Sequence, residues 1–160
     1  DVERRISMSE GPYILIVEAR FYEDIADELA RGAIAAIEAR DGTYLRVSVP
    51  GSLEIPAAIR FAVRSRELVG GRRRFDGYVA LGCVIRGETS HYDHVCREAI
   101  RGVNQLSLEY SLATGMGILT CDTHEQAMKR ASVSGLNKGA ATAAAAMDMI
   151  DVKRSFLPPR

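Results

Sequence analysis

The sequence predicts an α/β domain in which a parallel sheet lies between layers of helices. Short apolar runs rich in β-branched residues alternate with amphipathic segments of helical periodicity, in the order βαβαβαβαα. The strand-like runs are nearly continuous in apolar residues, which is typical of strands covered on both faces. The 160 residues suffice for one domain with one substantial core, so we expect a single sheet.

The first half of the chain predicts two strands and two helices. Tyr13–Val17 is an apolar run and gives the first strand, and apolar residues at intervals of three and four over residues 25–37 give the first helix. Residues 44–49 give the second strand. Residues 54–66 give the second helix, in which Pro56 is tolerated because it falls in the first turn.

The second half continues the alternation. Residues 78–85 form the longest apolar run and predict the central strand, which a long amphipathic helix over about residues 95–110 follows. Residues 117–120 give the fourth strand, residues 125–131 a short helix, and residues 138–150 an alanine-rich helix. Small side chains on this last helix suit close packing.

The charge balance and the cysteines narrow the class of protein. Because 21 basic residues balance 21 acidic ones, and no apolar run is long enough to span a membrane, we expect neither a nucleic-acid partner nor a membrane partner. Cys83, Cys96 and Cys121 form no disulfide framework or CxxC motif and suit the reducing cytoplasm. Three parts are expected: a mobile segment (1–12), one domain (13–152) and a tail (153–160).

Functional residues should lie in the loops that follow the strands. In open parallel sheets, ligands bind outside the carboxyl ends of the strands, near the point where the strand order reverses. This rule selects four loops, at residues 19–22, 50–54, 86–94 and 121–123.

The loop after the third predicted strand offers two kinds of chemistry. Gly87 lets the chain turn, and Thr89 or Ser90 can cap the long helix, so the exposed amides form a possible phosphate site. His91 and His94 are three residues apart, but no third ligand has metal-site spacing to them, so no metal is expected. A single histidine acting as proton carrier is favoured. The alternative, in which both histidines lie on the helix surface without a chemical role, stays open.

Other candidates have equally simple structural explanations. Glu54 could bind a polyol or only complement a helix dipole, and Arg130 could bind phosphate or only stabilise a helix end. Lys138 begins a helix, where a cation opposes the dipole, which hints at a ligand. Phe21, directly after the first strand, either packs at the edge of the apolar core or offers a stacking surface to a planar ligand.

Five motifs in order resemble one enzyme family. They are ARF at 19–21, VPGSLEIP at 49–56, ALGCVIRGETSHYDHV at 80–95, GILT followed by EQAMKRA within 117–131, and NKG at 137–139. Together they resemble 6,7-dimethyl-8-ribityllumazine synthase, from about Tyr13 to Ile150. The resemblance implies a flavodoxin-like three-layer α/β/α sandwich with a four-stranded parallel sheet. It also implies a transferase of riboflavin biosynthesis with no metal or redox cofactor.

The implied reaction joins 5-amino-6-(D-ribitylamino)uracil to 3,4-dihydroxy-2-butanone 4-phosphate and gives 6,7-dimethyl-8-ribityllumazine, phosphate and water. By position in the motifs, His91 would carry the proton. The implied ribitylaminouracil site comprises Phe21, Ser52, Leu53, Glu54, Cys83, Val84, Ile85, Met116 and Lys138. The implied butanone phosphate site comprises Gly87, Glu88, Thr89 and Arg130.

The resemblance also implies a homo-oligomer with sites between adjacent subunits. Arg130, Met116 and Lys138 would come from the neighbouring subunit, so at least a pentamer is expected. The alternative hypothesis is a pentameric flavin or ribityl-ligand carrier on the same scaffold, with little turnover.

Overall fold

The structure of the chain is a computed structural model that describes residues 11–69 and 74–158, apart from the side chains of residues 66–69. Residues 1–10 of the expected N-terminal segment and residues 159–160 of the expected tail lie outside the described residues. Of the helices in the described ranges, none is both long enough and apolar enough to cross a membrane.

The elements follow the predicted alternation. In chain order they are β1 (Tyr13–Ala19), α2 (Glu23–Glu38), β2 (Thr43–Val49), the short 3-10 helix η1 (Ser52–Glu54), α3 (Ile55–Val69), β3 (Gly77–Ile85), α4 (His91–Tyr110), β4 (Thr114–Cys121), α5 (His124–Ala131) and α6 (Lys138–Ser155). The four strands are all parallel and pair in the order β2-β1-β3-β4. The predicted four-stranded parallel sheet is therefore confirmed.

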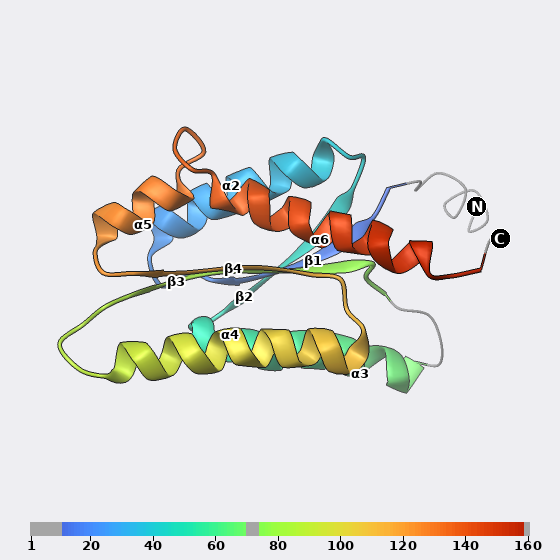
Figure 1. Cartoon of the computed structure of the whole chain (residues 1–160), viewed down its shortest axis with the longest axis horizontal. Coiled ribbons are helices and arrows are strands. Elements are labelled where there is room, and N and C mark those ends of the chain that lie inside the picture. The colour runs from blue at the N-terminus through green and yellow to red at the C-terminus, as the bar shows by residue number, and fades with distance from the viewer. Residues whose placement is uncertain (1–10, 70–73, 159–160) are drawn as a thin grey trace.

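Helices cover both faces of the sheet, so the molecule has three layers. Figure 1 shows α2, α5 and α6 above the sheet and α3 and α4 below it. The strand order reverses between β1 and β3, because the chain passes from β1 to β2 on one side and then returns to β3 on the other. The carboxyl ends of the strands lie at the left of Figure 1, and α6 ends at the opposite side of the molecule.

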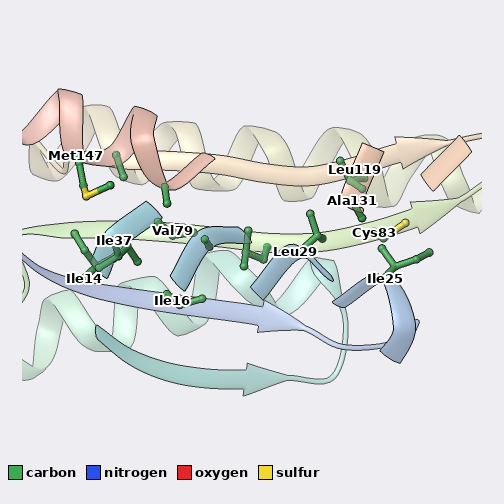
Figure 2. Packing of buried hydrophobic residues seen from close by; sticks show 14 of the residues in the cluster. Ile14, Ile16, Ile25, Leu29, Ile37, Val79, Cys83, Leu119, Ala131 and Met147 are labelled. Carbon is green, nitrogen blue, oxygen red and sulfur yellow. The ribbon is translucent and has the colours of Figure 1, made fainter. Parts of the chain in front are cut away.

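Each face of the sheet has its own apolar core. The core under α2, α5 and α6 contains β-branched and leucine side chains from the strands and α2, including Ile14, Ile16 and Leu29 (Figure 2). Helices α2 and α6 approach closely, since a Cβ on Gly139 would lie 2.0 Å from the carbonyl oxygen of Leu29. The alanine-rich α6 thus packs closely against its neighbour, as its small side chains predicted. The other core, under α3 and α4, contains Phe75 and Tyr78.

Two strand boundaries differ from the prediction by two or more residues. Strand β1 continues through Glu18 to Ala19, because the Glu18 carboxylate is paired and buried at 3% exposure. Strand β4 begins at Thr114, three residues before the predicted Gly117. A Cβ on Gly115 would lie 2.1 Å from the carbonyl oxygen of Thr142 in α6, so glycine here permits helix contact even though it disfavours a strand.

Candidate functional site

A cavity of about 410 Å³ lies at the carboxyl ends of β1 and β3, where the strand order reverses. The connection after β1, the turn after β2, the end of β3 and the start of α4 contribute its walls. The lining residues are Phe21, Tyr22, Gly51, Ser52, Leu53, Glu54, Cys83, Val84, Ile85, His91 and Val95. The structure thus brings together eight of the residues proposed from the sequence, from segments that are far apart in the chain.

Phe21 and Tyr22 form the wall contributed by the connection between β1 and α2. The Phe21 side chain is 74% exposed and meets the Tyr22 ring edge-on, with ring centroids 5.0 Å apart. Burial, and then the nearby Cys83 thiol, raise the pKa of Tyr22, so its hydroxyl stays protonated at neutral pH. An exposed aromatic face held beside a second ring is suited to stack on a planar ligand.

The turn after β2 lies against β3 because Gly82 has no side chain. Ser52 is buried in η1, and a Cβ on Gly82 would lie only 2.6 Å from its Oγ atom. The Glu54 carboxylate folds back toward Gly51, since a Cβ there would lie 3.1 Å from Glu54 Oε2. Ser52 and Glu54 both line the cavity, so a hydroxyl and a carboxylate are available there as hydrogen-bond partners for a polyol.

Cys83 belongs to the cavity wall and to the core behind it. Burial, followed by the neighbouring Cys121, Asp24 and Cys96, raises the pKa of the Cys83 thiol to about 12. The thiol is therefore neutral at physiological pH. Since the thiolate is the form that attacks electrophiles and binds metals, Cys83 contributes an apolar surface and not a reactive group.

The loop from β3 to α4 is open to solvent. Gly87, Glu88 and Thr89 are exposed, and a Cβ on Gly87 would meet no atom within 4 Å. Ser90 occupies the cap position of α4 but makes no side-chain cap hydrogen bond, whereas the His91 backbone N–H donates to Thr89 Oγ1 over 3.3 Å. Of the two predicted capping residues, Thr89 therefore makes the local bond.

Arg86 ties this loop to the loop after β4. Its Nε donates to Asp122 Oδ1 over 2.8 Å, and its Nη1 lies 3.6 Å from Asp93 Oδ1. The guanidinium also lies over the Tyr92 ring, 4.4 Å from the centroid. This contact set fixes one end of a loop whose other residues are solvent-exposed.

The remaining proposed residues lie outside the cavity lining. Gly87, Glu88 and Thr89 are on the loop beside it, Met116 is 41% exposed on β4, and Lys138 is the exposed first residue of α6. Arg130 lies in the last turn of α5, where its Nη1 donates to the Gln126 carbonyl oxygen over 3.0 Å.

Three lining residues were not among the proposed site residues: Tyr22, Gly51 and Val95. Tyr22 follows Phe21, and Val95 lies four residues after His91, hence on the same side of the helix. Helical spacing from His91 could have found Val95. In the described ranges, 11–69 and 74–158, no three His, Cys, Asp or Glu side chains are grouped as a metal ion requires.

The fold and the cavity define a class of protein: an open α/β sandwich that binds a small molecule at the point of strand-order reversal. A family model described as 6,7-dimethyl-8-ribityllumazine synthase matches residues 11–154. The chain belongs to this family, as its sequence motifs predicted.

Curated relatives that bear this name cover most of the chain. The protein from Bartonella tribocorum is 47% identical over 149 residues, covering 93% of this chain and 95% of the relative. The protein from Methylorubrum extorquens strain PA1 is 51% identical over 145 residues, covering 91% and 83% respectively. The protein from Afipia carboxidovorans is 48% identical over 149 residues, covering 93% and 90%.

Proposed function

We propose that this protein condenses 5-amino-6-(D-ribitylamino)uracil with 3,4-dihydroxy-2-butanone 4-phosphate to give 6,7-dimethyl-8-ribityllumazine, phosphate and water, in riboflavin biosynthesis. One observation carries the proposal. In a chain of this family, a single cavity gathers an exposed aromatic ring, a hydroxyl, a carboxylate, a strand end and a histidine.

The aminopyrimidine occupies this cavity. Its planar ring stacks on Phe21, and its polar edge pairs with backbone groups of Cys83–Ile85, where β3 ends. The ribityl hydroxyls bind at Ser52–Glu54, which offer both donors and acceptors.

His91 exchanges protons during the condensation. The amine of the pyrimidine adds to the ketone and loses one water to form an imine. Elimination of phosphate leaves an enol that tautomerises to a new ketone, and the ribitylamino nitrogen closes the ring on this carbonyl with loss of a second water. Each step moves a proton, and imidazole accepts and donates protons readily near neutral pH. His91 lines the cavity beside the exposed loop, so both substrates come within its reach. Holding the two substrates together supplies most of the rate enhancement.

The second substrate binds through its phosphate at the loop between β3 and α4. Gly87, Glu88 and Thr89 are exposed there and precede the N-terminus of α4, where backbone N–H groups attract anions. Arg130 of a neighbouring subunit supplies the cation, because a guanidinium can bind two phosphate oxygens at once.

The active form is a cytoplasmic homopentamer with sites between adjacent subunits. Met116, Arg130 and Lys138 do not line the cavity of their own chain, which supports contribution of these residues to a neighbour's site. The three cysteines are free thiols, which supports a reducing compartment. Sedimentation separates the pentamer from a decamer or a shell of sixty subunits.

The proposal is tested by mixing the purified protein with both substrates and following lumazine fluorescence together with phosphate release. We expect both signals to rise in parallel, faster than in a mixture without protein. Each substrate alone serves as control. A rate equal to that of the uncatalysed reaction contradicts the enzyme, and tight lumazine binding without turnover indicates the ribityl-ligand carrier instead.

A further inference from the structure

A buried carboxylate lies near the end of β1, two residues before the connection that carries Phe21. Among the residues that the structure describes, Glu18 is the one charged residue that is buried, with 3% of its surface exposed. It accepts hydrogen bonds from Arg46 on β2, from Nε to Oε2 over 2.7 Å and from Nη2 to Oε1 over 3.0 Å. Arg20 Nη1 donates to Oε1 over 2.9 Å. A buried carboxylate is tolerated only when it is paired in this way.

Arg20 links this carboxylate to α2. While its Nη1 bonds to Glu18, its Nη2 bonds to Asp27 Oδ1 on the first turns of α2. The two carboxylates raise the pKa of Arg20, Asp27 by the larger amount, so the guanidinium stays charged. Only a forked guanidinium offers two such donors in one rigid plane.

This link bridges the connection from β1 to α2. It consists of Arg20, Phe21 and Tyr22, and α2 begins without a side-chain cap hydrogen bond from Tyr22. Phe21 itself is largely exposed, so packing fixes its backbone little. Arg20 is adjacent to Phe21 and is bonded to the strand before the connection and to the helix after it.

We propose that Arg20 is a positioning residue, which acts through Phe21 to hold the stacking ring in place for the aminopyrimidine. This inference rests on the proposed function, because it assigns Arg20 to the pyrimidine part of that site. Arg46 makes contact with the same Glu18 but belongs to β2, so it stabilises the carboxylate without holding Phe21.

The test compares R20K with the matched variant R46K. Lysine keeps the charge at either position, but its single ammonium group cannot reproduce the fork. We expect R20K to raise the KM for the aminopyrimidine about five- to tenfold, which corresponds to the typical net contribution of one hydrogen bond. The KM for the phosphate substrate and kcat should stay within about twofold, because neither depends on the stacking ring. R46K should leave both KM values within about twofold, since it perturbs no part of the connection.

A double-mutant cycle separates positioning from general structural support. If Arg20 acts through Phe21, the combination R20K/F21A has the same KM as F21A alone. The inference would be overturned if the increases in KM caused by R20K and F21A multiplied in the combined variant. It would also be overturned if R20K and R46K raised this KM equally.

Hydrogen exchange keeps the inference testable if the wild-type protein makes no lumazine and the proposed function fails. The backbone amides of residues 20–24 should then exchange faster in R20K than in R46K or the wild type. Equal exchange in the two variants overturns the inference whatever the activity, and unfolding midpoints confirm that both variants are folded.

Discussion

The two halves of the candidate site are built differently. The pyrimidine half, formed by Phe21, Ser52–Glu54 and Cys83–Ile85, is a walled cavity within one chain, and buried side chains support it from behind. The phosphate half, formed by Gly87–Thr89 and Arg130, is an exposed loop and a helix end apart from it. The difference indicates that one chain shapes the walls of the pyrimidine half, which Met116 and Lys138 of a neighbour would only complete under the proposed function. The phosphate half, in contrast, would take its cation, Arg130, from that second subunit.

Replacing Arg130 tests the phosphate half with the largest expected effect. Arg130→Ala should raise the KM for the butanone phosphate about 100-fold, since it removes charge-assisted hydrogen bonds to phosphate. Lumazine binding should be unchanged, because the product lacks phosphate. Lys129→Ala, one residue earlier on α5, is the matched control and should behave as wild type. Equal losses for both substrates would show that Arg130 is structural.

His91 stands between the two halves, so its replacement should affect turnover and not binding. His91→Ala should lower kcat about 30-fold, somewhat below the usual range for an acid–base residue, because positioning continues to act. Steady-state rates measure this loss. His94→Ala, on the same helix but outside the cavity lining, should leave kcat unchanged. Complete loss in a folded His91 variant would show that proton transfer dominates.

Phe21 tests the pyrimidine half. Phe21→Ala should raise the KM for the aminopyrimidine about tenfold, which matches the loss of one stacking contact to a flat ring. Stability should hardly change, since the ring is 74% exposed. Phe156→Ala, 83% exposed at the end of α6, controls for removal of an exposed aromatic group. A raised KM for the phosphate substrate instead would reverse the assignment of the two halves.

Replacement of Arg86 tests the phosphate half again, with a smaller expected effect on KM than replacement of Arg130. Arg86→Ala should raise the KM for the phosphate substrate about two- to threefold, because solvent-exposed ion pairs contribute little. Asp122→Asn, which keeps the shape of the acceptor, should show the same trend. Kinetics with each substrate varied in turn measure the effect, and a change confined to the aminopyrimidine would contradict it.

Cys83 tests the pyrimidine half through pH. Its thiol has a pKa of about 12 in the folded chain against 9.0 for an ordinary thiol, so the unfolded chain loses this proton first. Stability from the buried neutral thiol is complete below pH 9 and falls between pH 9 and 12. The difference in unfolding free energy between wild type and Cys83→Ala should shrink by about 1 kcal/mol at pH 10. Urea unfolding at pH 8 and 10 measures it, and a constant difference contradicts the burial argument.

Local patterns predicted the sheet and the loops that line the cavity. Periodicity located the strands, and the rule for parallel sheets located the loops that hold Phe21, Ser52 and His91. Periodicity could not show that Glu18 continues β1, since the partners that permit its burial, Arg20 and Arg46, are chosen by the fold. Nor could spacing within one chain group Arg130 with His91, because under the proposed function that grouping would depend on contacts between subunits.

The direction of α6 has a practical consequence. The helix starts at the site edge of the sheet and carries the chain to the opposite side of the molecule, where Phe156 follows it (Figure 1). A fusion partner or surface anchor joined beyond Leu157 is therefore attached far from the mouth of the cavity. The protein can be immobilised by that end with its substrate entrance facing the solution.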